Sequence, residues 1–202
     1  MAPRTQAQFE EMRETRRLQI METALKLFAQ EGYGHCSISM LAREAGISKG
    51  LMYNYFKSKD ALLKAIIDHG MDQLMGLFDP NHDGVLTREE FAGFIRKVFA
   101  AIRSHQEYWI LFISVIMQPR VKEHLKKEIF VRYMDEFISM LVQYFTGQGF
   151  PDPMLEVITF AAMIEGFGVL LIYAYPAIEF PEEILHRYEN RIIEMYALDK
   201  HN

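Results

Sequence analysis

Oxygen-bearing side chains are regularly spaced over the twelve residues DPNHDGVLTREE, from Asp79 to Glu90. Carboxylate, amide or hydroxyl groups stand at the first, third, fifth, ninth and twelfth positions, and Gly84 at the sixth permits a sharp bend. A hard cation such as Ca²⁺ takes about six to eight oxygen ligands, and a loop with this spacing can wrap them around one ion. The predicted ligands are the side chains of Asp79, Asn81, Asp83, Thr87 and Glu90 and the backbone carbonyl of Val85.

The residues on either side make the segment resemble an EF-hand, a helix-loop-helix calcium site. LMGLF precedes the loop and TREEFAGFIRKVF closes it, with the flanking phenylalanines that EF-hands pack together, and Leu86 is an apolar anchor. A polar turn is the other interpretation. Asp-Pro-Asn favours a turn, and Thr87 with Glu90 forms a capping box for the next helix. The sequence predicts one Ca²⁺ site per chain, regulatory or simply stabilising.

A second stretch, SISMLAREAGISKGLMYNYFKSKD, predicts two short helices joined by a tight turn at Gly46-Ile47. In a helix-turn-helix the first helix braces the second, which enters the major groove of DNA. Six apolar residues are expected to form a small core: Leu41, Ala42, Ala45, Ile47, Met52 and Phe56. That leaves five residues of the second helix to face outward for phosphate and base contacts: Lys49, Leu51, Tyr53, Asn54 and Tyr55.

Residues 17–63 resemble the DNA-binding domain of the TetR family of bacterial transcriptional regulators, from IMETALKLFAQEGY through LMYNYFKSKDALL. The resemblance implies phosphate, groove or base contacts by Ser39, Ser48, Lys49, Gly50, Leu51, Tyr53, Asn54, Tyr55 and Lys59. The family commonly has threonine where Leu51 stands, and an aromatic residue followed by histidine where Asn54 and Tyr55 stand. The DNA sequence that is recognised therefore cannot be carried over from a relative.

The resemblance also implies a homodimer that binds a pseudo-palindromic double-stranded operator, most simply as a repressor. The last two expected helices, Val157–Tyr175 and Pro181–Leu198, would form the dimer interface, where small residues such as Ala161, Ala162 and Gly166 let helices approach closely. The expected organisation is a helix-turn-helix domain over 1–58 and a helical domain over 59–202 for effector binding and dimerisation, with the EF-hand-like loop inside it.

Apolar residues recur every three or four positions in nearly every segment, which predicts an all-α protein. Serines and prolines mark the ends of the helices, with Ser39, Ser48 and Ser58 as expected N-caps. The expected helices are Glu10–Gln30, Met40–Ala45, Ser48–Phe56, Lys59–Phe78, Arg88–Ser104, Gln106–Gln118, Arg120–Gly147, Pro153–Tyr175 and Pro181–Leu198.

Large soft side chains on the central helices suggest a cavity for an apolar effector of unknown identity. They are Trp109, Phe112, Met117, Phe130, Tyr133, Met134, Phe137, Met140, Phe160, Met163 and Phe167. His105, Gln118 and Glu165 are the polar groups expected to orient a ligand. A packed core explains the same apolar residues, and Glu165 is either a ligand contact or a paired charge at the dimer interface.

Composition narrows the class of protein. The net charge is −5, yet residues 1–60 carry nine Lys and Arg against seven Asp and Glu, so basic residues are concentrated where DNA contacts are expected. Cys36 is the only cysteine, which excludes an intrachain disulfide and fits a cytoplasmic setting. The apolar segment 157–175 is interrupted by Glu165, so we expect it to be buried in protein rather than in a membrane.

No catalytic motif indicates an enzyme. The alternative function is a calcium-binding helical protein whose EF-hand is the main site.

Overall fold

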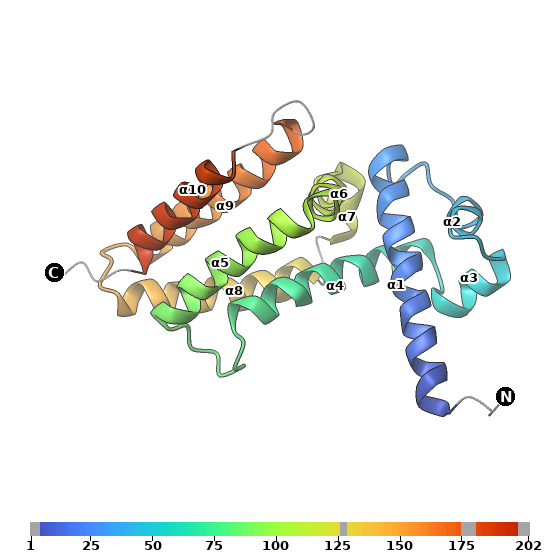
Figure 1. The fold of residues 1–202 in the computed structure, drawn as a ribbon, viewed down its shortest axis with the longest axis horizontal. Coiled ribbons are helices and arrows are strands. Elements are labelled where there is room, and N and C mark those ends of the chain that lie inside the picture. Colours follow the sequence, from blue (N-terminus) through green and yellow to red (C-terminus); the bar gives the residue numbers. More distant parts are fainter. Residues whose placement is uncertain (1–4, 126–128, 175–180, 198–202) are drawn as a thin grey trace. The chain divides into compact units, whose positions relative to one another are not determined.

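The computed structural model describes residues 5–125, 129–174 and 181–197, and these residues form ten α-helices and no strand (Figure 1). The all-α prediction is confirmed. The helices are α1 (Gln6–Glu31), α2 (Ile38–Glu44), α3 (Lys49–Tyr55), α4 (Lys59–Phe78), α5 (Arg88–Ser104), α6 (Gln106–Ile116), α7 (Pro119–Leu125), α8 (Ile129–Gly147), α9 (Pro153–Ala174) and α10 (Glu182–Tyr196).

The chain divides into two compact units. The first unit contains the residues up to His69 together with Ser114–Leu125. The second unit contains Gly70–Ile113 and the described helices after Leu125. The first unit therefore holds more than the expected 1–58 domain. Leu62, Leu63 and Ile66 of α4 are almost fully buried, which explains why the start of this helix belongs with the helix-turn-helix.

Serine and threonine side chains start several of these helices by accepting hydrogen bonds from otherwise unpaired backbone N–H groups. Ser48 accepts from Leu51 N–H at 3.1 Å, and Ser58 accepts from Ala61 N–H at 3.0 Å, as the sequence indicated. The expected cap at Ser39 is wrong. Ser37 is the N-cap of α2 and accepts from Met40 N–H at 3.2 Å, which places Ser39 inside the helix.

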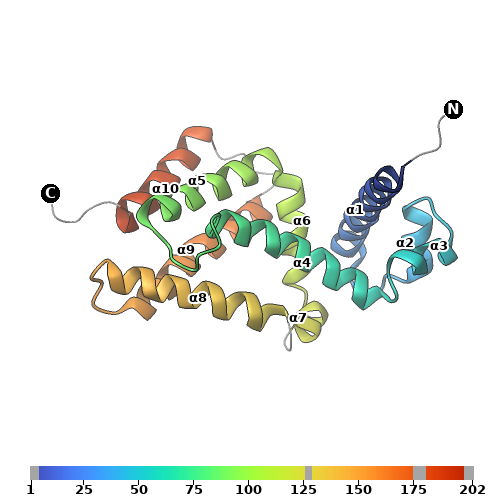
Figure 2. The same cartoon turned by 90° about the horizontal axis from the view of Figure 1, so that it is seen from below.

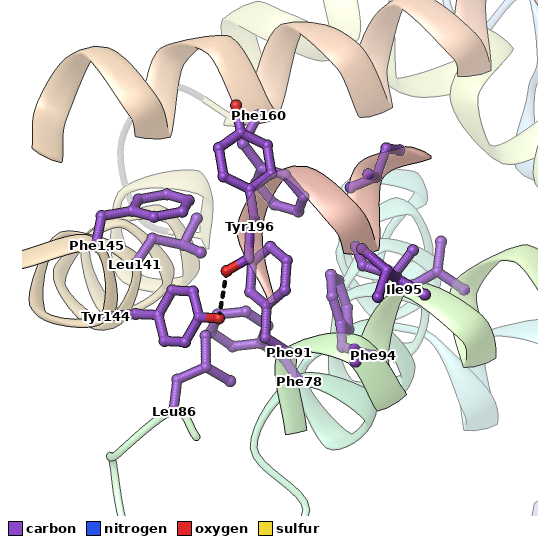
Figure 3. Packing of buried hydrophobic residues seen from close by; sticks show 14 of the residues in the cluster. Phe78, Leu86, Phe91, Phe94, Ile95, Leu141, Tyr144, Phe145, Phe160 and Tyr196 are labelled. Atoms are coloured by element: carbon purple, nitrogen blue, oxygen red, sulfur yellow. Dashed lines mark hydrogen bonds between the residues drawn. The ribbon is translucent and has the colours of Figure 1, made fainter. Parts of the chain in front are cut away.

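In the second unit, α8 packs on α9 and α5 packs on α10 (Figure 2). Phe91 of α5 is at the centre of their shared core. Its ring stacks on that of Tyr144, with the centroids 4.8 Å apart, and its centroid is 5.1 Å from that of Phe160. Tyr144 donates a 2.7 Å hydrogen bond from its hydroxyl to the backbone carbonyl of Tyr196, which joins α8 to the end of α10 (Figure 3). This aromatic core fixes α5 directly after the 79–90 loop.

The core tyrosines make the fold sensitive to alkali. Burial raises the pKa of the Tyr144 and Tyr196 phenols to about 12, against about 10 in an unfolded chain. The unfolded state ionises first, so the stabilisation from these groups is complete below about pH 10 and is lost as the pH rises towards 12. We expect the free energy of unfolding to fall across this range, and to fall less steeply in Tyr144→Phe/Tyr196→Phe. Urea unfolding followed by circular dichroism at several pH values measures both slopes; equal slopes would contradict the assignment.

Candidate functional site

The helix-turn-helix is built around the small core expected from the sequence. Leu41 and Ala42 of α2 are buried, as are Met52 of α3 and Phe56 directly after it. Gly46 has a φ of +64° in the turn between the helices, a backbone conformation that suits glycine. Ala45 and Ile47, also expected in this core, are half-buried. The packing fixes which side of α3 faces outward.

The outward side of α3 carries large side chains that the fold does not use. Leu51 is 40% exposed and Tyr53 is 41% exposed, and Lys49, Gly50 and Asn54 are exposed as well. Tyr55 is half-buried, while Ser48 and Ser39 are exposed at the start of α3 and within α2. A lysine, an amide and a phenol on one short helix offer donors for phosphate oxygens and for base edges in the major groove.

Lys59, expected to pair with DNA phosphate, is engaged inside the first unit. Its ammonium donates to the backbone carbonyls of Tyr33 at 2.8 Å and Cys36 at 2.9 Å, and it lies 4.2 Å from the centre of the Tyr33 ring. Tyr33 in turn donates its hydroxyl to Asp60. Lys59 therefore ties the start of α4 to the segment between α1 and α2, and its phosphate contact stays a prediction. The side chain of Cys36 is buried beside this contact.

Gln118 is a structural residue that the sequence reading assigned to a ligand. Its side-chain oxygen accepts from the backbone N–H of Tyr33, and its side-chain nitrogen donates to the carbonyl of Phe28, both at 2.8 Å. These bonds satisfy two backbone groups at the end of α1. The amide is therefore used within the first unit, where it positions the helix that supports the helix-turn-helix. No local pattern identifies it, since its partners are 85 and 90 residues away.

In the 79–90 loop, the chain folds around its own side-chain oxygens. Gly84 N–H donates to Asp79 Oδ2 at 3.1 Å, Asp83 N–H donates to Asn81 Oδ1 at 3.1 Å, and Val85 N–H donates to Asp83 Oδ1 at 2.8 Å. Gly84 has a φ of +73°, which the bend requires. Leu86 is buried in the core of the second unit, as an apolar anchor should be (Figure 3).

The far end of this loop is closed on itself by the capping box. Glu90 Oε2 accepts from Thr87 N–H at 2.9 Å and from the Thr87 hydroxyl at 2.8 Å, and Thr87 Oγ1 accepts from Glu90 N–H at 3.1 Å. Within the described part of the chain, no three Asp, Glu, His or Cys side chains surround one point as a metal would need. The helix cap of the polar-turn interpretation is therefore formed, and side-chain oxygens of Asp79, Asn81 and Asp83 accept hydrogen bonds from backbone N–H groups of the loop. Binding of Ca²⁺ stays a prediction.

The expected effector residues divide into buried and exposed groups. Trp109, Phe112 and Met140 are buried in the second unit, and Phe137 is half-buried beside Phe78. His105 is exposed at the end of α5, and Met117 is 39% exposed in the segment that belongs to the first unit. The side chains of Phe130 and Tyr133 lie outside those that the structure describes. The polar groups expected to orient a ligand are therefore not gathered among the buried aromatic residues.

Glu189 is the buried carboxylate that the sequence reading missed. It is 6% exposed on α10 and pairs with Arg103 of α5 at 3.0 Å, whereas Glu165, expected as a ligand contact or a paired charge at the dimer interface, is exposed on α9. A buried carboxylate requires such a partner, because an unpaired charge inside a protein is costly. Arg103 with Glu189 is thus a structural ion pair between α5 and α10, and Glu165 is free to act at an interface.

Residues 20–66 match the sequence profile of a protein family described as "bacterial regulatory proteins, tetR family". YuxN, an uncharacterized HTH-type transcriptional regulator of Bacillus subtilis, is 50% identical over 62 residues, which are 31% of this chain. The matches cover between 21% and 37% of the length of three curated relatives, so this chain spans only a part of each.

Two solved structures share the fold over most of the chain. NalD, the secondary repressor of the MexAB-OprM multidrug efflux pump in Pseudomonas aeruginosa, is 17% identical with a TM-score of 0.68, over 94% of this chain and 99% of that one. FadR from Bacillus subtilis, solved in complex with stearoyl-CoA, is 21% identical with a TM-score of 0.65, over 91% and 99%. These relatives are transcriptional regulators and not enzymes. The match to the tetR family thus covers residues 20–66, which include α2 and α3, and the two solved structures share the fold of the chain.

Proposed function

We propose that the protein is a transcriptional repressor that binds a pseudo-palindromic operator as a homodimer, with α3 of each protomer in a major groove. The observation that carries the proposal is the outward face of α3, where Lys49, Leu51 and Tyr53 are exposed although Met52 between them is fully buried. Two such helices related by a two-fold axis read two half-sites about one helical turn apart, or a multiple of that distance. The cytoplasm, where the chromosome lies, is the matching location.

The dimer interface is proposed on α9 and α10. α9 exposes Leu155, Ile158 and Leu170, each more than half exposed, and α10 exposes Ile184. Ala162 and Gly166 are exposed on α9 as well, and nothing lies within 4 Å of where a Cβ on Gly166 would stand. Small residues between large apolar ones allow close packing of helices from a second copy, so this face fits an isologous interface.

α9 also raises the question of a membrane. Its segment Pro153–Leu170 is long and apolar enough to cross one by length and composition, and 22% of that segment is buried. A second protein copy explains the exposed apolar side chains equally well, and it tolerates the exposed carboxylate of Glu165 near the middle of the helix. We therefore propose that α9 packs against a second protein copy and that the regulator acts in the cytoplasm.

An apolar organic molecule is the proposed effector. The second unit carries a dense set of aromatic and methionine side chains, including Trp109, Phe112 and Met140, which suit a flexible apolar ligand. FadR, which shares the fold, was solved with stearoyl-CoA, and this favours a long acyl chain as the first ligand to examine. Ca²⁺ at the 79–90 loop is a second proposed modulator.

Selection from random duplex DNA with the purified full-length protein tests the DNA-binding function. The expected result is enrichment of an inverted repeat whose half-site centres are about 10 base pairs, or a multiple, apart. Fluorescence anisotropy with the enriched duplex should then give two protomers or a multiple of two per site, and a scrambled duplex of equal length should bind far more weakly. Failure to enrich any repeat, with a folded dimeric protein, would contradict the proposal.

A further inference from the structure

We propose that the 79–90 loop binds one Ca²⁺ ion per chain. The ligands are the side chains of Asp79, Asn81 and Asp83, the carbonyl of Val85 and both carboxylate oxygens of Glu90, with Thr87 contacting the ion directly or through water. This gives six oxygens before any water, within the range that Ca²⁺ takes. The site belongs to the second unit, whereas α3 belongs to the first, and ion binding does not depend on the proposed operator binding.

Asp79 is the observation that points to a cation. Asp79 is only 8% exposed, and its side-chain oxygen Oδ1 is buried without a hydrogen-bond partner among the described residues. The other oxygen, Oδ2, accepts from Gly84 N–H inside the loop, so the carboxylate is turned into the loop. Burying a carboxylate oxygen without a partner is costly, and such groups in native proteins usually have a donor, a counter-charge or a metal.

The position of Asp79 is fixed by its neighbour. Phe78 is fully buried, with its ring centroid 5.0 Å from that of Phe94 and 4.5 Å from that of Phe137. The backbone of Asp79 cannot move out to solvent without pulling Phe78 from this core, which would expose a large apolar surface. The backbone of Asp79 is therefore held at the end of α4, directly after the buried Phe78 (Figure 3).

Charge in the loop also favours a cation. Asp79, Asp83, Glu89 and Glu90 are four carboxylates within twelve residues, and none of them forms an ion pair within the described part of the chain. Arg88 is the one Lys or Arg of the loop, and its Nε donates to Gln148 at the end of α8. A divalent ion would offset the repulsion among these carboxylates at a distance of one ligand bond.

The carboxylate of Glu90 has to change its hydrogen-bond partners when the ion binds. In the present arrangement its carboxylate caps α5 through Thr87 N–H, and it must rotate into the loop to bind the ion. Thr87 Oγ1 accepts from Glu90 N–H independently, so the start of α5 keeps one cap when the carboxylate leaves. The ion thus competes with a capping hydrogen bond, and we expect a dissociation constant between about 10⁻⁶ and 10⁻⁴ M.

Calorimetric titration of chelator-treated full-length protein tests the site. CaCl₂ should bind once per chain, and MgCl₂ should bind much more weakly, because Mg²⁺ demands tighter octahedral geometry. Glu90→Gln keeps a residue that can complete the capping box but loses the bidentate carboxylate, so Ca²⁺ affinity should fall roughly 100-fold. Glu89→Gln removes the same charge from the next, exposed residue and should change affinity less than about twofold. Equal losses in both variants would overturn the site in favour of general attraction.

Thermal melting gives a second readout that does not rely on heat of binding. A hundredfold excess of Ca²⁺ over its dissociation constant should raise the Tm of the wild-type protein and Glu89→Gln by about 5–10 °C, and that of Glu90→Gln far less. Asp79→Asn keeps an acceptor for Gly84 N–H and removes the buried charge. Its Tm without Ca²⁺ should not fall, and its response to Ca²⁺ should be lost. No binding heat and no shift at millimolar Ca²⁺ would overturn the proposal.

Regulation by this ion rests on the proposed function. The helix α4 runs from Lys59, which holds the segment between α1 and α2, to Phe78, next to Asp79. An ion that fixes the end of α4 should change operator affinity by about fivefold or more in the wild-type protein and not in Glu90→Gln. The operator assay at constant ionic strength, with CaCl₂ or with chelator, measures this. Ca²⁺ binding with unchanged operator affinity would overturn the regulatory role alone.

Discussion

Lys49→Ala should weaken operator binding by the dimer roughly 100-fold at low salt without loss of the fold. A charge-assisted hydrogen bond to phosphate contributes about 1.5 kcal/mol, and the dimer uses the contact twice, for about 3 kcal/mol in total. Lys49 is exposed at the first position of α3, directly after the Ser48 cap, so its side chain adds little to folding. The measurement is anisotropy of a labelled operator duplex, with thermal melting to verify the fold.

Salt dependence separates a phosphate contact from a general effect of charge. Each lost phosphate contact lowers the slope of log affinity against log salt by about 0.9, so the Lys49→Ala dimer should lose a slope of about 2. Lys97→Ala is the matched control, since Lys97 is exposed on α5 in the second unit. It removes the same charge and should leave both affinity and slope nearly unchanged. A similar loss in both variants would show that α3 is not the reading helix.

Much of the fold could be predicted because local chemistry marks the helix ends. The bounds of α4 and α5 agree with the sequence prediction at both ends. Ser58 and the Thr87–Glu90 capping box mark the starts, and Asp79-Pro80 marks the stop between them. The start of α2 was predicted two residues too late, because serine is a good cap at position 39 as well as at position 37, where the cap is formed. Lys59 holds the Cys36 carbonyl, which fixes the backbone just before Ser37, and no local pattern shows that contact.

Some residues of the candidate sites could likewise be predicted from local patterns, and others could not. The outward face of α3 follows from helical periodicity, because burying Met52 leaves its neighbours exposed. The tasks of Gln118 and Glu189 depend on partners more than 80 residues away, so they became visible only in three dimensions. Glu165 shows the converse: its apolar neighbours suggested burial, and it faces outward because one side of α9 is not covered by the described chain.

Phe91→Ala should lower the free energy of unfolding of the second unit by about 3–5 kcal/mol, the usual cost of truncating a buried phenylalanine. Phe91 is fully buried and its ring contacts Tyr144, Phe160 and Tyr196, so three other helices lose a packing partner at once. The loss is a large part of the stability of a typical domain, about 5–15 kcal/mol. Urea unfolding followed by the fluorescence of Trp109, the single tryptophan, reports on this unit.

Phe9→Ala provides the control, since Phe9 is 56% exposed on α1 and its removal should change the free energy of unfolding by less than about 0.5 kcal/mol. Because Phe91 directly follows Glu90, its truncation should also loosen the start of α5 and weaken any Ca²⁺ binding that depends on Glu90. The DNA contacts proposed for α3 belong to the other unit, so operator binding should be less affected in protein that remains folded. A loss below about 1 kcal/mol would mean that the aromatic core can close around the missing ring, and that the 79–90 loop is not held as rigidly as its buried neighbours indicate.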